Sequence, residues 1–301
     1  MKALRSFAAA AVIVVSLAAC STVEQGLNVL GKAADAADKA DKVVSVAMKF
    51  RSSFAEITEE EEYYIGRAVA AIILSKYRVT DNAALTQYVN TMGNAVALFS
   101  DRPEIYAGYH FLILDSDEVN ALSAPGGLIF VTRGLLKRCS DEEMLGLVLA
   151  HEIGHVSAKH GLQAIKKSRL TEAFTYLGGQ AARTWGSAEL VQATNLFEGA
   201  LDDIVQQLVV RGYDRSAELE ADALAVRFAA RTGYEPAGIQ RFLKTMVGDK
   251  SGASGSGWFK THPSAEQRLE KVAAQIGAIS PLPKIDAART SRFKQATSGL
   301  R

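Results

Sequence analysis

The stretch "LGLVLAHEIGHVSAKH", residues 145–160, constrains the fold of this chain more than any other. Its first part is apolar enough for a buried helix, yet His151 and His155 flank Glu152 there. His151 and His155 are spaced i, i+4, so on a helix both imidazoles lie on one face, roughly 6 Å apart at the backbone. Glu152 lies about 100° further round the helix. A charged side chain in such a run is costly unless it has a partner or a chemical role.

This spacing predicts a metal site. Two ring nitrogens placed in this way can both reach one Zn²⁺ at about 2.0–2.1 Å. Glu152 is badly placed as a further ligand, but it can take a proton from a water on the metal. This is the H-E-x-x-H arrangement of two ligands and a general base. The alternative is a core helix that carries imidazoles by chance, and the glutamate within the apolar run argues against it.

A catalytic zinc site also needs a third protein ligand and an open position. The other histidines are His110, His160 and His262. His110 falls in a predicted strand, where a structural role is favoured over ligation. His160 lies about 500° around the helix from His155 and is expected to point away from the pair. A carboxylate is therefore the better candidate for the third ligand.

The segment "YDRSAELEADALAVRFAARTGY", residues 213–234, offers several carboxylates on a predicted helix. Glu218 and Asp222 share one face, whereas Glu220 lies on the opposite side. Glu218 can therefore reach the metal, while Asp222 can accept the second ring N–H of a ligand histidine. The alternative is that Asp222 is an ordinary surface residue. Arg215 is expected to form a structural ion pair with an acidic neighbour near the site.

In the rest of the chain, the spacing of apolar residues predicts mainly helices, with two short strands. Helices are predicted over residues 58–77, 81–99, 140–161, 188–232, 237–248 and 264–276, and strands over 109–115 and 127–132. Thr58 and Ser140 each precede a glutamate at the third position, which is typical of a capping box. Two neighbouring strands predict a small sheet beside a helical body, so the expected fold class is α+β.

The N-terminal residues 1–19 are typical of a secretory signal peptide, because a basic start is followed by a short apolar run. Residues 17–20, "LAAC", resemble the bacterial lipobox, so Cys20 is the predicted site of lipidation. The alternative is an ordinary signal peptide with an incidental cysteine. By the same resemblance to bacterial lipoproteins, Ser21 after the cysteine implies the outer membrane. Residues 20–57 are predicted to be a lipid-anchored helical tether, and residues 279–301 a loose tail.

Net charge and cysteine content limit the partners and the disulfides that the chain can have. The formal net charge is +1, which gives no field for nucleic acid. If Cys20 carries lipid, Cys139 has no partner for a disulfide within the chain, and it is expected to be an inert structural thiol.

The motifs together resemble one family, the gluzincin metallopeptidases related to the CAAX prenyl proteases, HtpX and the Oma-type peptidases. His151–His155 and "YDRSAELEAD" carry the resemblance, together with "NALSAPGGLIFVTRGLL", residues 120–136, and "THPSAEQRL", residues 261–269. The similarity covers roughly residues 58–276. It implies a zincin-like domain over 58–278 that binds one zinc ion per chain, with Glu218 as the third ligand. The lipobox makes the chain similar to the soluble periplasmic branch.

The resemblance implies a zinc endopeptidase that hydrolyses unfolded or damaged envelope proteins at the periplasmic face of the outer membrane. Glu152 is the expected general base. His262 is the candidate donor to the developing oxyanion, or else it occupies the position of the water in a resting state. The alternative is that His262 is only a helix-entry residue before Pro263.

Residues 120–131 are expected to supply an edge strand that aligns an extended substrate through main-chain pairing. Asn120 and Ala121 begin this strand, and Gly126 and Gly127 form its turn. The alternative function is a chaperone or assembly factor for outer-membrane proteins whose zinc site is structural or normally closed. A lipoprotein scaffold with no metal is a third possibility. The intact Glu152 favours an active enzyme.

Overall fold

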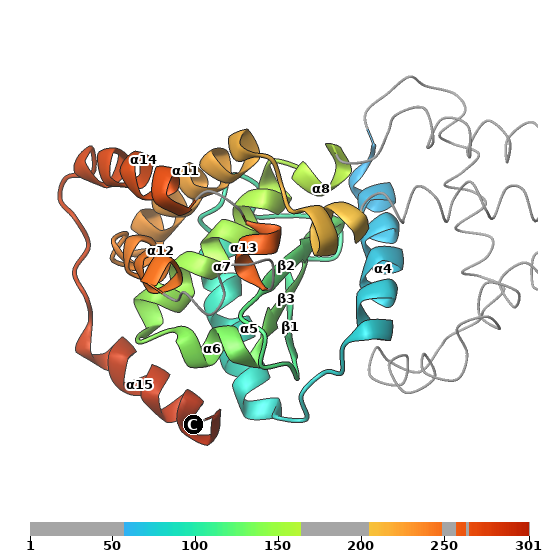
Figure 1. Cartoon of the computed structure of the whole chain (residues 1–301), viewed down its shortest axis with the longest axis horizontal. Helices are drawn as coiled ribbons and strands as arrows, with labels where there is room; N and C mark the ends of the chain where they lie inside the picture. Colours follow the sequence, from blue (N-terminus) through green and yellow to red (C-terminus); the bar gives the residue numbers. More distant parts are fainter. Residues whose placement is uncertain (1–56, 164–204, 249–256, 263–264, 301) are drawn as a thin grey trace, which may run out of the picture.

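The computed structural model describes residues 57–163, 205–248, 257–262 and 265–300 of the 301 (Figure 1). The helices are α4 Glu59–Lys76, α5 Ala83–Ala97, α6 Arg133–Arg138, α7 Glu142–Ser157, α8 His160–Gln163, α11 Arg215–Thr232, α12 Gly238–Gly248, α13 Trp258–Thr261, α14 Ala265–Gly277 and α15 Ala287–Thr297. Short turns of other helix types are η1 Pro125–Gly127, η2 Gln206–Arg211 and η3 Ser298–Leu300. The strands are β1 His110–Leu114, β2 Ala121–Ala124 and β3 Leu128–Thr132. The predicted α+β, mainly helical class is confirmed.

The sheet has the strand order β1-β3-β2. β1 runs parallel to β3, with His110 opposite Leu128, and β2 runs antiparallel to β3, with Ala121 opposite Val131. The two strands predicted from sequence correspond to β1 and β3 and are indeed neighbours. The third strand, β2, lies in the connection between them, just before the Pro-Gly-Gly turn. This places β2 at one edge of the sheet.

Alternate residues of the strands enter two separate cores, because successive side chains point to opposite faces of a sheet. Leu122, Leu128 and Phe130 pack with Ile65, Val69 and Ile73 of α4 on one face. Ala121, Ile129 and Val131 pack on the other face with α5, α7 and α11. α8 and η2 contribute Leu162 and Leu208 to the same core as α4, and Figure 1 shows α4 on the opposite side of the sheet from α5. The helix with the two histidines therefore lies against the sheet.

Two helix starts show how the local sequence sets the boundaries. Thr58 and Glu61 form the predicted capping box of α4, with backbone-to-side-chain bonds of 2.8 and 3.2 Å. For α7 the cap is Asp141 and not Ser140, because the Asp141 carboxylate accepts the Met144 N–H at 2.8 Å. Glu143 is buried and engaged elsewhere, so the predicted capping box of α7 is wrong.

The predicted helix over 188–232 is interrupted within its described part. Gly212 has a positive φ of 74°, and Asp214 then caps a new helix by accepting the Ala217 N–H at 2.9 Å. α11 therefore begins at Arg215 and ends at Thr232, and Gly233 after it takes the left-handed conformation that favours glycine. The break leaves Tyr213 outside the helices, beside the histidines of α7. Residues 188–204 lie outside the described residues.

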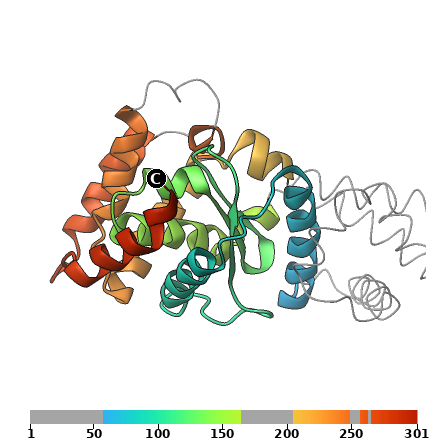
Figure 2. The same ribbon diagram turned by 90° about the horizontal axis from the view of Figure 1, so that it is seen from below.

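The C-terminal residues differ from the loose tail that the sequence predicted. α15 packs on α5 and α7 (Figure 2), and Phe293 is 1% exposed. Arg292 Nε donates to Glu142 Oε2 at 2.6 Å, and Arg289 Nη1 lies 3.3 Å from Glu143 Oε1. Both glutamates are buried in the first turn of α7. The last residues are therefore tied to the start of the histidine-bearing helix.

In the part of the chain that the structure describes, every helix is too short or too polar to cross a membrane. The predicted signal peptide, Cys20 and the tether lie outside the described residues. Cys139 is a buried free thiol whose pKa is raised by burial. A thiol held protonated is a poor nucleophile, which agrees with the structural role expected for it.

Candidate metal centre

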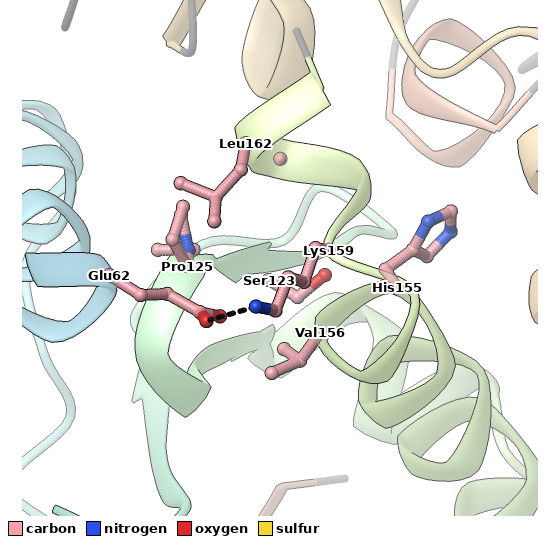
Figure 3. Close-up of a pocket in the computed structure, with 9 residues that line it drawn as sticks. Glu62, Ser123, Pro125, His155, Val156, Lys159 and Leu162 are labelled. Atoms are coloured by element: carbon pink, nitrogen blue, oxygen red, sulfur yellow. Dashed lines mark ion pairs between the residues drawn. The ribbon is translucent and has the colours of Figure 1, made fainter. Parts of the chain in front are cut away.

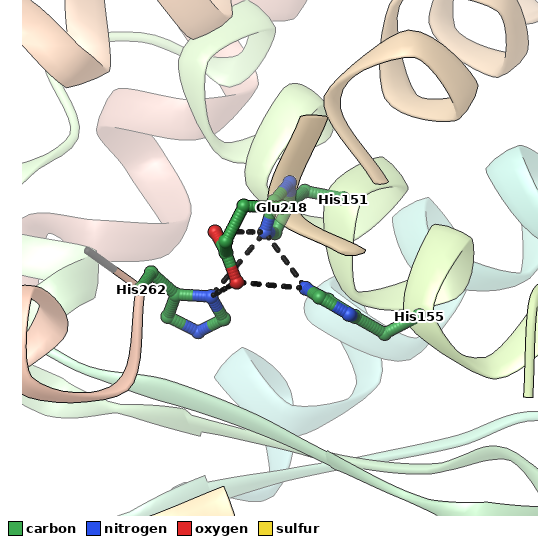
Figure 4. Close-up of side chains that lie close together, drawn as sticks. All are labelled: His151, His155, Glu218 and His262. Atoms are coloured by element: carbon green, nitrogen blue, oxygen red, sulfur yellow. Dashed lines mark hydrogen bonds and ion pairs between the residues drawn. The ribbon is translucent and has the colours of Figure 1, made fainter. Parts of the chain in front are cut away.

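α7 and α11 pack side by side and bring three predicted ligands together (Figure 4). His151 Nε2 and His155 Nε2 are 3.0 Å apart, and each lies 3.5 Å from a carboxylate oxygen of Glu218. All three side chains are buried. Gly154, between the histidines, allows this approach: a Cβ there would lie 3.1 Å from the Ala221 carbonyl oxygen. The glycine of H-E-I-G-H therefore brings the second helix close to the first.

His262 reaches the same cluster from a distant part of the chain. It follows α13, and its Nδ1 lies 2.9 Å from Glu218 Oε1 and 3.4 Å from His151 Nε2. The His262 ring stacks on the indole of Trp258, with centroids 4.0 Å apart. Four side chains thus offer nitrogen or oxygen atoms within 4.8 Å of one another. Two of them come from α7, one from α11 and one from the end of α13.

These atoms fit a zinc ion. Two ligand atoms bound tetrahedrally at 2.0–2.1 Å would be separated by about 3.4 Å. The separations among His151, His155 and Glu218 are 3.0, 3.5 and 3.5 Å. The donor set of imidazole and carboxylate is also one that zinc uses. His262 lies where a fourth ligand would be, or next to it.

Glu152 is wholly buried, and within the described residues its two carboxylate oxygens accept no hydrogen bond. His262 Nε2 lies 3.5 Å from Glu152 Oε1. A buried carboxylate without a donor is costly. A proton-bearing ligand between Glu152 and the cluster would provide that donor, so this observation also fits a site built to act on a bound water.

Outside the cluster, Asp222 holds His151. Asp222 Oδ1 lies 3.0 Å from His151 Nδ1, which leaves Nε2 directed at the cluster. Asp222 is itself buried and contacts Arg268 twice at 2.7 Å. The structure therefore places Asp222 beside the histidine pair, where the sequence predicted it, and not on the surface.

The electrostatic environment shifts the pKa values of His151 and His155 in opposite directions. Burial opposes a charge on His151, but close contacts with the carboxylates of Asp222 and Glu218 raise its pKa to about 9. Burial lowers the pKa of His155 well below its ordinary value. Burial opposes ionisation of Glu218, yet His262 and Arg268 hold the pKa of its carboxyl well below the ordinary value. Without metal, these shifts favour a proton on His151 rather than on His155 and keep Glu218 ionised.

His160 does not point away, as its helical angle predicted. α7 ends at Ser157, and Lys159 adopts a positive φ of 56°, so the chain turns before His160. His160 Nδ1 then lies 2.9 Å from His155 Nδ1, and its Nε2 lies 3.4 Å from Glu220. His160 thus contacts Nδ1 of His155, the ring nitrogen that does not face the cluster. A direction calculated from continuous helix geometry could not show this.

Two further residues at the site were missed from the sequence. Tyr213 stacks on His155, with ring centroids 4.1 Å apart and planes at 16°. Arg268 of α14 is fully buried, and its Nη1 lies 2.7 Å from Glu218 Oε2. One signal could have revealed Arg268: it shares a helical stripe with Val272 and Ile276, both buried, at i+4 and i+8.

Arg215, by contrast, is exposed at the start of α11, and within the described residues no ion pair joins it to the cluster. The arginine that reaches the site is Arg268. His110 is exposed on β1, where its Nε2 lies 2.9 Å from the Ala107 carbonyl, in agreement with a structural role.

The predicted substrate strand is covered. β2 is an edge strand, but all four of its residues are buried, and η2 contacts it. Asn120 Oδ1 accepts bonds from Ala121 N–H at 3.0 Å and from the Thr261 hydroxyl at 2.9 Å. The backbone N–H of Trp258 donates to the Val119 carbonyl at 2.7 Å. The segment that carries His262 is therefore bonded to the start of the predicted substrate strand.

Gly126 and Gly127 have φ values of 70° and 84°, which L side chains rarely adopt. A Cβ on Gly126 would lie 2.6 Å from Cα of Tyr63. The turn is thus required for the packing of α4, and a bulky substitution would disturb the fold as well as any substrate. Beside this turn, a cavity of about 10 Å³ lies behind His155, crossed by the Glu62–Lys159 pair (Figure 3). It has room for about one water.

The centre is of the metallopeptidase type: two packed helices carry a buried His-His-Glu cluster beside a small sheet. The chain belongs to peptidase family M48. The profile of that family matches residues 83–276, more than half of the chain. The gluzincin resemblance inferred from the motifs is therefore confirmed. The match stops before α15.

Individual relatives are more distant. The beta-barrel assembly-enhancing protease of Yersinia pestis is 27% identical over 66% of this chain and 40% of its own length. The protein of the same name in Escherichia coli K12 is 25% identical over 84% of this chain and 51% of its own length. Metalloprotease YcaL of Escherichia coli K12 is 28% identical over 56% of this chain and 63% of its own length. The chain thus spans about half the length of the first two relatives.

Proposed function

We propose that this chain is a zinc-dependent endopeptidase that hydrolyses unfolded or damaged proteins of the bacterial envelope at the outer membrane. The observation that carries the proposal is the buried cluster of His151, His155 and Glu218 beside a buried Glu152 whose oxygens accept no hydrogen bond from the described part of the chain. Membership of peptidase family M48 supports the same chemistry. The names of the relatives, which include proteases that enhance beta-barrel assembly, support an envelope substrate.

His151, His155 and Glu218 would hold the metal. Zinc bound there would supply an electrophilic centre that lowers the pKa of water toward 7. Glu152 is placed to accept a proton from the attacking water and to pass it to the leaving amine. His262, whose Nε2 lies 3.5 Å from Glu152, is the proposed donor to the oxygen of the scissile carbonyl. Asp222 keeps the His151 ring oriented through its Nδ1.

The remaining parts of the proposal concern the location and the substrate. Lipid on Cys20 would attach the chain to the membrane, and residues 20–57 would tether the peptidase domain. The strand from Asn120 to Ala124 would align an extended polypeptide by main-chain pairing, with Ala121 near its start. Such pairing reads the backbone more than the side chains, which suits unfolded proteins.

A second candidate is a chaperone or assembly factor whose zinc site is normally closed. The covered edge of β2 favours this candidate, because η2 contacts β2 and the segment of Trp258 and Thr261 is bonded to Val119 and Asn120 just before it. In the first candidate the same segment must move away before a substrate can bind.

Cleavage of unfolded casein by the purified chain separates the two. The endopeptidase proposal predicts cleavage that stops with a chelator, returns with Zn²⁺, and is lost in Glu152→Gln while zinc stays bound. His110→Gln, which alters an exposed histidine, serves as the control and should cleave normally. Cleavage that survives in Glu152→Gln refutes the mechanism. Bound zinc with no cleavage under any of these conditions favours the second candidate.

A further inference from the structure

Glu62 is a buried carboxylate of α4 that faces the end of the histidine-bearing helix (Figure 3). Its Oε1 accepts bonds from the Gly126 N–H at 3.2 Å and from Arg102 Nη1 at 3.3 Å, and its Oε2 accepts from Arg102 Nη2 at 3.0 Å. Lys159 Nζ lies 3.9 Å from the same Oε2. Glutamate is almost never fully buried unless it is paired. α4 lies outside residues 83–276, so the family match does not account for this carboxylate.

Arg102 joins Glu62 to the last turn of α7. In addition to its bonds to the carboxylate, its Nη1 donates to the Val156 carbonyl at 3.3 Å. That carbonyl also accepts the Lys159 N–H at 3.0 Å. The last carbonyls of a helix have no partner within the helix, and a cation near this end is favoured by the helix dipole. Arg102 therefore binds the same carbonyl that holds the turn by which the chain leaves α7.

This turn has a backbone conformation that requires support. Lys159 has a φ of 56°, in the left-handed region, where a residue other than glycine costs free energy and persists only if its surroundings fix it. The residue that follows the turn is His160, whose Nδ1 lies 2.9 Å from His155 Nδ1. The place of His160 beside the cluster thus depends on the conformation of Lys159.

We propose that Glu62 and Arg102 are positioning residues of the metal centre, which hold the left-handed turn at Lys159 and thereby keep His160 against His155. The carboxylate of Glu62 fixes the guanidinium through two bonds, and the guanidinium fixes the Val156 carbonyl. A ligand histidine is oriented by the partner of its second ring nitrogen. The inference rests on the proposed zinc function only for its effect on metal binding.

A purely structural role is the competing explanation, because the same pair joins α4 to α7. Such a role predicts lower stability for a variant of the pair, but it does not predict that a change at Lys159 restores the centre. Glycine adopts the left-handed conformation without a steric cost. Lys159→Gly should therefore keep the turn in place even where Arg102 has been removed.

The experiment compares the full chain with Arg102→Met, with Lys159→Gly and with the variant that combines them. Chelator competition measures zinc affinity, and nitrogen NMR of the metal-free chain records the ring signals of the histidines. We expect Arg102→Met to lose up to about tenfold in zinc affinity, the lower end of the loss for outer partners of metal ligands. It should also shift the signals of His155 and His160 but not those of the exposed His110. Lys159→Gly should bind zinc as the wild type does, and the combined variant should regain the affinity and the signals.

Arg241→Met is the matched control. Arg241 also pairs with two carboxylates, those of Asp141 and Glu235, but at the opposite end of α7. Thermal unfolding of the metal-free chain should show a loss of stability in this variant. Its zinc affinity and its histidine signals should match those of the wild type.

The inference is overturned if Arg102→Met keeps the zinc affinity and histidine signals of the wild type, or if Lys159→Gly does not restore them. If Arg102→Met does not fold, Glu62→Gln takes its place in the same comparison, because it removes the charge but keeps an acceptor for the Gly126 N–H. Wild-type chain that binds zinc but does not cleave casein contradicts the proposed function and leaves this inference standing. If the wild type binds no zinc, the proposed function fails, and the histidine signals of the metal-free variants decide this inference.

Discussion

Arg292 of α15 donates from Nε and Nη2 to the buried carboxylate of Glu142 in the first turn of α7. Tyr88 and Tyr234 donate to the same carboxylate at 2.8 and 3.1 Å. The C-terminal helix thus completes the hydrogen bonding of a carboxylate that has no access to water. Its stabilising effect can be measured apart from the metal centre.

Arg292→Ala should lower the free energy of unfolding by about 2 kcal/mol, since a hydrogen-bonded buried charge loses a charged donor while both tyrosines remain. Denaturant unfolding with zinc in excess measures this. Arg227→Ala, which breaks an exposed pair with Asp101, should cost less than about 1 kcal/mol. Equal losses in the two variants would show that α15 contributes no more than a surface contact.

His160→Ala should weaken zinc binding by about tenfold, the lower end of the range for outer partners of ligand histidines. Its imidazole is the partner of His155 Nδ1 at 2.9 Å, and without it the ring is less well oriented. Chelator competition measures the affinity, and His110→Ala on the exposed part of β1 is the control. Identical affinities for both variants would exclude a role for His160 in orienting His155.

Zinc affinity should rise steeply with pH up to about 9. Because the pKa of His151 is raised to about 9, its ring keeps a proton at neutral pH in the metal-free chain, and zinc must displace that proton. The affinity should therefore increase by up to about tenfold per pH unit below pH 9. Asp222→Asn removes the main partner that raises this pKa, so the steep range should move to lower pH. An affinity that does not change between pH 7 and 9 would contradict this prediction.

The same shift affects the stability of the metal-free chain. The folded-state pKa of His151 is above the ordinary value of 6.5, so the protonated ring stabilises the fold fully below pH 6.5. This contribution should be lost as the pH rises through about 9. Unfolding of the metal-free chain across this range measures the loss, and Asp222→Asn should make it smaller.

Thr261→Val should increase casein cleavage a few-fold if the segment with His262 must leave β2 for a substrate to enter. The substitution keeps the shape of the side chain but removes the donor to Asn120 Oδ1. One hydrogen bond is worth about 0.5–1.5 kcal/mol, which limits the gain to about tenfold. Thr297→Val, in which a buried hydroxyl bonded to Phe293 is lost, is the control. Reduced or unchanged cleavage would mean that this contact does not hold the site closed.

The sequence predicted the features that depend on local pattern. β1 and β3 follow from apolar runs bounded by turn residues, and the capping box of Thr58 follows from a spacing of three residues. His151, His155 and Glu218 could be nominated because helical periodicity places side chains on a face without knowledge of the tertiary structure. Their convergence required the packing of α7 on α11, which Gly154 permits.

The features that were missed depend on where the chain leaves regular structure or on distant contacts. His160 returns to the site because Lys159 takes a left-handed conformation, and α11 starts afresh after Gly212. α15 has a polar composition and gains its place from two glutamates far away in the chain. Arg268 is a charged residue on the apolar face of its helix. Its role could not be predicted, because it depends on Asp222 and Glu218, which only the tertiary structure places beside it.

The stacking of Trp258 on His262 gives the chain an intrinsic optical reporter. The protein has two tryptophans, and Trp258 is fully buried with its ring centroid 5.6 Å from that of His151. In a Trp185→Phe background all indole fluorescence would arise beside the metal centre. Zinc titrations and any departure of His262 could then be followed by emission in real time, with no label attached to the protein.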